Sequence, residues 1–239
     1  MAAEIPVTNS RRSAVDRIRT RQKFSIPEES VVFCFGFDVR SVVARKNPIG
    51  ALDAFQKAFP YTSRADDNQL PNVSLLIKSF PFRGFSPEWE LVKARCMEDP
   101  RIILVCESLT RSELLDLYQS CDIFLSMHRS EGFGRGIAEA LQLGLKAICT
   151  DFGGNVDYCR HALSNYYPVN FSEMTISPGQ YPFSTGHLWA EPDIDHAAKL
   201  CREVSEVVIN EERNLEKIEV LSHHFVGSAY KNSLEKIYR

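Results

Sequence analysis

The stretch Arg129-Ser-Glu-Gly-Phe-Gly-Arg-Gly-Ile-Ala-Glu139 lies between two short apolar runs that have the character of buried strands. These runs are Ile123-Phe-Leu-Ser126 and Lys146-Ala-Ile-Cys-Thr150, and residues 135–143 between them have the pattern of a helix. A strand, a glycine-rich turn and a helix gather backbone N–H groups at one point, where phosphates commonly bind. We therefore expect the glycine corner, residues 131–139, to hold a nucleotide diphosphate.

The segments around this corner also alternate between strand and helix. Further strands are expected at residues 31–35, 73–77 and 101–106, and helices at 48–59, 86–97 and 110–120. This alternation predicts an α/β fold of the Rossmann-like, doubly wound type, in which helices cover both faces of a parallel sheet. Ligands of such sheets bind at the carboxyl ends of the strands. The loops that follow the strands should therefore share one rim: 38–47, 78–85, 106–110, 126–136 and 151–157.

The two ends of the chain carry weaker signals. Residues 1–30 are polar and are interpreted as a linker or lead-in to a domain that spans residues 31–239. Their basic cluster indicates either a solvated helix face or a contact with an anionic membrane surface. It comprises Arg11, Arg12, Arg17, Arg19, Arg21 and Lys23. Residues 172–190 are expected to be an ordered loop, followed by helices at 193–209, 211–222 and 225–238.

The composition argues against several classes of protein. A net charge of −3 gives no field that would attract nucleic acid, so that partner is not expected. No apolar run approaches the roughly 20 residues that span a bilayer, and the first residues lack the apolar segment of a secretion signal. Seven cysteines, an odd number without a CxxC pair, favour free thiols in a reducing compartment. We therefore expect a cytoplasmic protein, with a peripheral membrane contact as the alternative.

In the glycine corner, the start of the helix offers unpaired N–H donors and a partial positive charge. Gly132, Gly134 and Gly136 let the backbone approach a bulky anion. Glu139 lies beyond the phosphates along the helix, where its carboxylate would accept hydrogen bonds from the two hydroxyls of a ribose. Glu131 in the loop would lie nearer the transferred group. The alternative is a tight turn with two surface glutamates, which the helix dipole favours.

Two other loops on the same rim carry polar side chains. The segment Ser41-Val-Val-Ala-Arg-Lys-Asn-Pro48 places Arg45 and Lys46 after the first strand, where two cations opposite a helix start would clamp a diphosphate. The segment Asp151-Phe-Gly-Gly-Asn-Val156 follows another strand, and its Asn155 can exchange hydrogen bonds with a sugar or phosphate. The alternatives are a solvated cationic turn in the first loop and a strand-to-helix turn in the second.

Searches for a metal site or a nucleophile give little. Asp193-Ile-Asp195 is the one DxD spacing, but it opens a helix where aspartates serve as caps. His128 precedes the corner, where it would face the ligand or be a packed loop histidine. Phe133 interrupts any dinucleotide-binding fingerprint, and no Walker lysine or nucleophile elbow is present. We therefore expect neither a metal nor a resident cofactor.

Taken together, these residues resemble the C-terminal, donor-binding half of retaining glycosyltransferases with the two-domain GT-B fold, of the glycosyltransferase family 4 type. Glu131 and Glu139 match the E-x7-E signature of that family. The resemblance runs from about residue 31 to 205, and its further motifs are Arg45–Pro48, Ser126–Gly134, Asp151–Tyr158 and Gly186–Asp193. Arg135 departs from the family pattern, in which an apolar residue is common at this position.

By position, the resemblance assigns the ribose of the nucleotide to Glu139. It assigns the diphosphate, and the charge on the leaving nucleotide, to Arg45 and Lys46. Glu131 would contact the donor sugar, and the backbone from Gly132 to Gly136 would complete the phosphate site. The base would lie near Val105–Leu109. The other residues expected to bind the donor are Ser41, Glu107, Leu109, His128, Phe133, Arg135 and Asn155.

The implied reaction is transfer of a sugar from a nucleoside-diphosphate sugar to an acceptor hydroxyl, with retention and without a metal. The acceptor would be a glycan or a lipid-linked substrate, in the synthesis of a surface polysaccharide or glycoconjugate. The family's N-terminal acceptor domain is missing from this chain, so that domain or a partner subunit is an implied partner. Two alternatives stay open: a module that binds a nucleotide sugar without turnover, and a nucleotide-sugar epimerase or hydrolase that shares the fold.

Overall fold

The computed structural model of the protein describes residues 14–61 and 72–210. Its centre is a six-stranded sheet in the order β3-β2-β1-β4-β5-β6, in which every neighbouring pair is parallel. The strands are β1 (Val31–Phe37), β2 (Val73–Ser79), β3 (Ile102–Val105), β4 (Ile123–Ser126), β5 (Lys146–Thr150) and β6 (Tyr166–Val169). The predicted Rossmann-like parallel sheet is confirmed.

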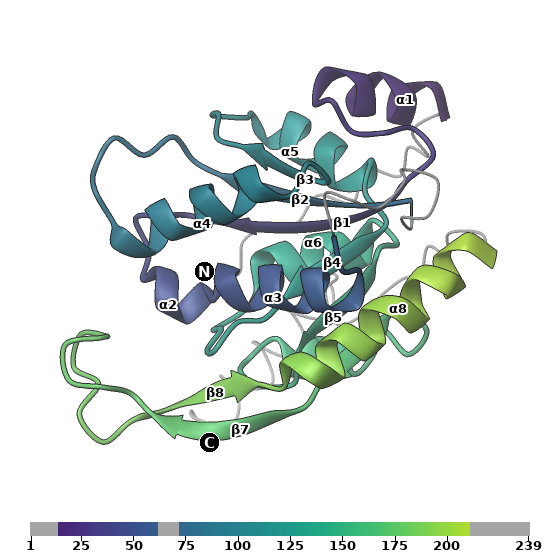
Figure 1. Cartoon of the computed structure of the whole chain (residues 1–239). Coiled ribbons are helices and arrows are strands. Elements are labelled where there is room, and N and C mark those ends of the chain that lie inside the picture. The colour runs from purple at the N-terminus through teal and green to yellow at the C-terminus, as the bar shows by residue number, and fades with distance from the viewer. Residues whose placement is uncertain (1–13, 62–71, 211–239) are drawn as a thin grey trace, which may run out of the picture.

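Helices cover both faces of the sheet (Figure 1), and each face has its own apolar core. One face carries α3 (Pro48–Ala58), α4 (Pro87–Glu98) and α8 (Ile194–Asn210), and the other carries α5 (Arg111–Gln119), α6 (Arg135–Gln142) and α7 (Val156–Cys159). The central strand β1 serves both cores, because successive side chains of a strand point to opposite faces. Phe33 and Phe35 enter the first core, whereas Val32 and Cys34 enter the second.

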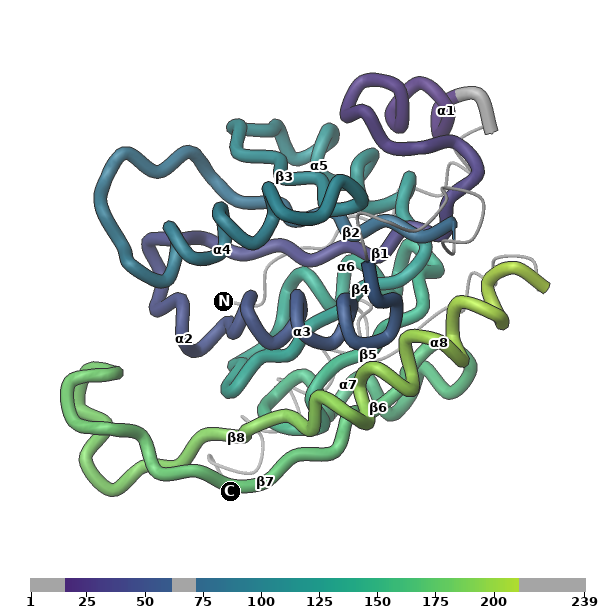
Figure 2. The backbone as a smooth tube through the Cα atoms, viewed as in Figure 1, coloured from purple at the N-terminus to yellow at the C-terminus, as the bar shows by residue number. Residues whose placement is uncertain are grey.

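The sheet changes its direction of growth beside β1. The chain adds β2 and β3 on one side of β1 and then crosses to the other side, where β4 pairs with β1 through Phe33↔Ile123 and Cys34↔Phe124. This crossing can be followed through α5 along the backbone tube (Figure 2). In open parallel sheets the crevice at such a switch point is the usual ligand site. The loops after β1 and β4 flank this crevice.

The helices predicted at residues 48–59 and 110–120 are present as α3 and α5, and each begins after a capping residue, Asn47 or Thr110. Asn47 has a φ of 50°, and its side chain accepts a hydrogen bond of 3.1 Å from the Gly50 N–H, with Pro48 in the first turn. Thr110 forms a capping box with Glu113, in which each side chain accepts from the backbone N–H of the other residue. These caps fix where α3 and α5 leave the rim of the sheet.

Residues 172–190, predicted as an ordered loop, instead contain most of an antiparallel hairpin. β7 (Phe171–Thr175) pairs with β8 (Leu188–Pro192), with Phe171 opposite Pro192. Trp189 is buried, so the hairpin has an inner face, which the prolines and glycines of the connecting turn obscured in the sequence. In Figure 1 the tip of the hairpin lies beyond the carboxyl ends of the sheet strands.

Near the end of the described chain, α8 confirms the helix predicted at residues 193–209. The side chain of Asp193 accepts a hydrogen bond of 3.0 Å from the His196 N–H, as expected of a cap. The helices predicted at 211–222 and 225–238 lie outside the described residues. Among the helices in the described ranges, none has the length and apolar character needed to cross a bilayer. All seven cysteines are free thiols.

The segment interpreted as a lead-in packs on the sheet from α1 (Ala14–Lys23) onward. Arg21 is 2% exposed, and its guanidinium pairs with Asp122 at 3.0 Å, so the solvated-face interpretation of the basic cluster is wrong for this residue. Phe24 and Ile26 join the second apolar core. The same guanidinium also donates to the carbonyl oxygens of Pro27, Glu28, Ser30 and Ser120. Arg11 and Arg12 lie outside the described residues.

Replacing Arg21 by methionine is expected to lower the free energy of unfolding by about 3 kcal/mol, because Asp122 and several buried carbonyls lose their donor. The control is Arg19→Met, an exposed position on the same helix, where a change within about 0.5 kcal/mol is expected. Urea unfolding of the two variants measures the difference. Equal stability of both would show that α1 does not depend on its buried arginine.

Candidate functional site

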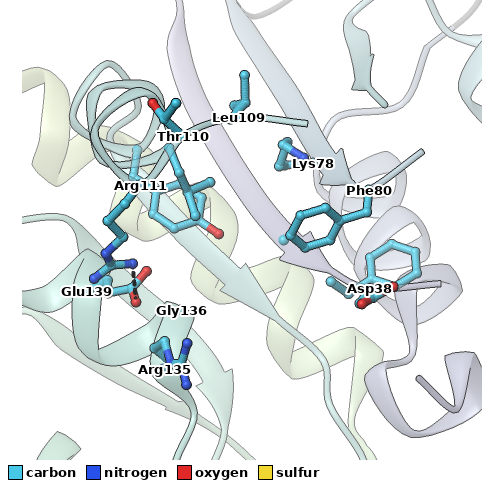
Figure 3. Close-up of a pocket in the computed structure, with 13 residues that line it drawn as sticks. Asp38, Lys78, Phe80, Leu109, Thr110, Arg111, Arg135, Gly136 and Glu139 are labelled. Atoms are coloured by element: carbon cyan, nitrogen blue, oxygen red, sulfur yellow. Dashed lines mark ion pairs between the residues drawn. The ribbon is translucent and has the colours of Figure 1, made fainter. Parts of the chain in front are cut away.

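A cavity of about 400 Å³ opens at the switch point of the sheet, at the carboxyl ends of β1 and β2 (Figure 3). Its walls come from four segments that the chain separates widely. The lining residues include Asp38 after β1, Lys78 and Phe80 at the end of β2, Leu109 to Arg111 at the start of α5, and Arg135, Gly136 and Glu139 on α6. The cavity therefore lies on the predicted rim and takes in part of the glycine corner.

Glu139 lies at one end of this cavity as a buried carboxylate. Its side chain is 2% exposed, and its Oε1 atom lies 2.6 Å from Nη1 of Arg111, whose side chain is 40% exposed. Oε1 makes no hydrogen bond of good geometry with any described residue. Burial raises the pKa of Glu139, against the opposing effects of Arg111 and Arg135. Figure 3 shows this ion pair reaching across the cavity wall from α5 to α6.

Lys78 and Arg111 are cavity residues that the sequence interpretation missed. Nζ of Lys78 is buried and donates to the carbonyl oxygens of Ser79 at 2.6 Å and Glu107 at 2.8 Å, which ties together the loops after β2 and β3. Burial lowers the pKa of Lys78. A signal for both was present, since Lys78 directly follows the strand expected at residues 73–77 and Arg111 lies in the first turn of the helix expected at 110–120.

A second cluster of charges joins the loop after β1 to the glycine corner. Arg45 and Lys46 lie on the short α2 (Val43–Lys46), and Nζ of Lys46 pairs with Oε2 of Glu131. Nη1 of Arg45 lies 3.7 Å from the same oxygen and donates to the carbonyl of Ser130 at 2.7 Å. Burial acts to raise the pKa of Glu131, but Lys46 and Arg45 bring it below its usual value. Arg45 and Lys46, which are expected to bind phosphate, therefore form ion pairs with Glu131, which is expected to contact the sugar.

His128 is a buried and hydrogen-bonded residue of the loop after β4. It is fully buried, and its Nδ1 lies 3.0 Å from Oγ of Ser126, whereas its Nε2 lies 2.9 Å from the carbonyl oxygen of Phe152. A carbonyl only accepts, so Nε2 carries the proton and Nδ1 accepts from the serine hydroxyl. Burial lowers the pKa of His128. The bond from Nε2 therefore joins the loop after β4 to the loop after β5, whereas the bond at Nδ1 ties His128 to the end of β4.

The glycines of these two loops meet backbone to backbone. The Gly154 N–H donates to the carbonyl of Glu131 at 3.0 Å, and a β-carbon on Gly154 would lie 1.9 Å from the carbonyl oxygen of Gly132. Gly153 has a φ of 103°, and a β-carbon there would lie 2.4 Å from the Glu131 carbonyl oxygen. Gly132 itself has nothing within 4 Å of its β-carbon position. The glycine pair is thus required for the close approach of the two loops.

Asn155 follows this glycine pair and packs against the start of α6. Gly134 caps α6 and has a φ of 74°. A β-carbon on Gly134 would lie 3.1 Å from Cβ of Asn155. The Asn155 side chain is fully buried, yet neither Oδ1 nor Nδ2 has a partner among the described residues. A buried amide without hydrogen-bond partners is rare in proteins.

The remaining predicted residues divide between the cavity and its surroundings. Leu109 lines the cavity, whereas Phe133 is an exposed residue of the glycine corner whose ring centroid lies 5.2 Å from that of Tyr158. Ser41 donates through Oγ to the Asp38 carbonyl at 2.6 Å and so closes the turn after β1. The side chain of Glu107 is exposed. Within the described ranges, no group of three or more acidic, histidine or cysteine residues is placed to hold a metal.

Gly154→Ala is expected to lower the free energy of unfolding by about 1–3 kcal/mol, because the new methyl group collides with backbone rather than with a flexible side chain. Gly132→Ala is the matched control, with open space at its β-carbon and an expected change within about 0.5 kcal/mol. Urea unfolding compares them. A Gly154 variant as stable as the Gly132 variant would contradict the close approach of the two loops.

The comparisons with known proteins agree with this fold. The family described as "Glycosyl transferases group 1" matches residues 16–174. A solved glycosyltransferase from Rickettsia africae ESF-5 superimposes with a TM-score of 0.51 at 17% identity, and WaaG, a glycosyltransferase involved in lipopolysaccharide biosynthesis, with 0.58 at 15%. The N-terminal domain of Candida albicans trehalose-6-phosphate phosphatase follows with 0.53 at 13%. No curated protein matches the sequence significantly.

These structural matches cover 87%, 86% and 85% of this chain but only 50%, 46% and 41% of the matched chains. The chain thus spans about half the length of the solved structures that it matches, or less. At such low identity the similarity shows the fold alone. The family match, in contrast, covers well over half of the chain, including β1 to β5 and the glycine corner. The chain therefore belongs to the glycosyl transferases group 1 family.

Proposed function

We propose that this chain is the donor-binding part of a retaining glycosyltransferase, which moves a sugar from a nucleoside diphosphate to an acceptor hydroxyl. The observation that carries this proposal is the cavity at the switch point. Along one helix it presents the carboxylate of Glu139, the backbone N–H groups at Gly136 and the cation of Arg135. A ribose needs an acceptor for its vicinal hydroxyls, and a diphosphate needs donors and positive charge.

In the proposed complex the ribose lies over Glu139 and the diphosphate lies at the start of α6. The base then occupies the opposite end of the cavity, near Leu109, where Lys78 fixes the carbonyl of Glu107. The ribose hydroxyls take the place of Arg111 on the carboxylate, because that guanidinium is half-exposed and can move into solvent. This order of groups leaves the sugar beyond the diphosphate, towards Glu131.

The cluster of Arg45, Lys46 and Glu131 is proposed as the site of transfer. When the bond between the anomeric carbon and the phosphate oxygen breaks, negative charge grows on the leaving phosphate. Preorganised cations stabilise such charge without a metal. Glu131 is held by Lys46 close to where the sugar would lie and would accept hydrogen bonds from its hydroxyls. We assign no protein nucleophile, and propose that retention arises from attack on the face of the leaving phosphate.

The acceptor is proposed to be a glycan or lipid-linked hydroxyl, in the synthesis of a surface polysaccharide or glycoconjugate, and to be bound by a second domain or subunit. Because the matched glycosyltransferases are about twice as long as the region that this chain covers, binding of the donor without turnover is the second candidate. Release of nucleotide from a donor sugar by this chain alone would exclude that candidate.

Calorimetric titration with UDP, GDP and ADP, in the presence of EDTA, is expected to show binding of at least one of them. Glu139→Gln should weaken this binding about tenfold or more, because a neutral amide replaces a charged acceptor. Glu98→Gln, at the exposed end of α4, is the control and should bind like the wild type. If none of the three nucleotides binds, the proposed function is wrong, and if Glu139→Gln binds equally well, Glu139 does not hold the ribose.

The nucleotide affinity is expected to decrease when the pH is lowered through the raised pKa of Glu139. The ribose hydroxyls donate to the ionised carboxylate, so binding weakens as the pH falls through a value above the usual glutamate pKa of about 4.3. The phosphates of the ligand titrate equally in the wild type and in Glu139→Gln, so the difference between the two pH profiles reports Glu139. Two parallel profiles would argue against an ionised Glu139 in the complex.

A further inference from the structure

The positive charges around the glycine corner differ in whether a carboxylate balances them. Arg45 and Lys46 face Glu131, and Arg111 faces Glu139. Arg129, just before the corner, makes a bidentate pair with Glu191 of β8 at 2.7 Å and 3.0 Å. These cations therefore have counter-ions within the protein, and an anionic ligand would have to compete for them.

Arg135 is the exception among the cations in and around the glycine corner. It is exposed, it lines the cavity, and it forms no ion pair or hydrogen bond with any residue that the structure describes. Its charge acts on Glu139, but that carboxylate is already paired with Arg111. In Figure 3 the dashed line joins Arg111 to Glu139, whereas Arg135 stands apart from that pair at the start of α6.

The position of Arg135 is unfavourable for the helix itself. It is the first residue of α6, where the helix dipole favours an acidic side chain, and the first turn of α6 contains none. The cap, Gly134, offers no side-chain acceptor to the free N–H groups. A cation beside uncapped donors at a helix start lowers stability in the absence of an anion, so helix formation does not explain this arginine.

A second feature lies beside the start of α6. The fully buried amide of Asn155 packs against Gly134, and its Oδ1 and Nδ2 have no partner within the described ranges. A ligand oxygen at the start of α6 would supply an acceptor for Nδ2. The unpaired guanidinium and the uncapped helix start thus lie together at the start of α6, and Asn155 packs beside them through its Cβ.

We propose that Arg135 determines the affinity for the diphosphate, because its guanidinium can bind phosphate oxygens without first leaving a carboxylate of the protein. This inference rests on the proposed function and deepens it, because it assigns the affinity for the bound diphosphate to one side chain. The guanidinium fork donates two hydrogen bonds to phosphate oxygens, beside the N–H groups of α6. Arg45 and Lys46 act mainly on the charge that develops during transfer.

The test compares Arg135→Leu with the wild type, using whichever of UDP, GDP and ADP binds the wild type most tightly. The affinity for that diphosphate is expected to fall about tenfold or more, because one charge-assisted contact is lost. The affinity for the matching nucleoside, measured by NMR titration, should stay within about twofold, because the nucleoside lacks phosphate. Arg135→Lys should restore part of the loss, since it keeps the charge without the fork.

Arg202→Leu on α8, an exposed arginine outside the cavity, is the charge-matched control and should bind the diphosphate like the wild type. A diphosphate affinity of Arg135→Leu within about twofold of the wild type would overturn the proposal, as would an equal loss for the nucleoside. If Glu139→Gln weakens binding but Arg135→Leu does not, the proposed function is supported and the proposed role of Arg135 is wrong. If the wild type binds no diphosphate at all, both fall.

Discussion

The carboxylate of Asp122 is the constraint on which the arrangement of the sheet depends. It accepts hydrogen bonds from the backbone N–H of Val32 at 2.9 Å and from the guanidinium groups of Arg17 at 2.6 Å and Arg21 at 3.0 Å. Its backbone N–H donates to the Val32 carbonyl at 2.8 Å, and its carbonyl accepts from the Lys146 N–H at 3.1 Å. One residue thus aligns the amino ends of β1, β4 and β5 with α1, and their carboxyl ends, which carry the site, follow from that register.

The parts of this structure that sequence reasoning predicts are those that depend on neighbours in the chain. Strand character, the caps at Asn47 and Thr110 and the glycine corner before α6 are set within a few residues, and the rim follows from the parallel sheet. The hairpin of β7 and β8 could not be read in this way, because its long connection of prolines and glycines hides the pairing. The pairs Lys46–Glu131 and Arg111–Glu139 join segments far apart in sequence, so neither could be predicted without the fold.

The pairing of charges changes how anion binding at this rim should be understood. A phosphate that engages Lys46 must share this cation with the carboxylate of Glu131, so the new ion pair is gained partly in exchange for the old one and the net gain is small. Such an arrangement suits a charge that grows during a reaction, because the exchange becomes favourable only when the anion becomes stronger. A cation without a carboxylate partner, in contrast, stabilises the bound ligand before the reaction begins. Affinity and transition-state stabilisation can therefore be carried by different side chains within one small region.

In the contact between the two glycine-bearing loops, stability favours glycine at one position, whereas only the approach of a ligand would favour it at another. At position 154 a side chain would collide with the backbone of Gly132, so glycine favours stability whether or not a ligand binds. At position 132 the surrounding space is open, and the fold would accept alanine or serine. As the sequence drifts over generations, glycine would be lost from position 132 in any lineage that no longer brings a bulky molecule to this corner. At position 154 the cost in stability would favour glycine in both kinds of lineage.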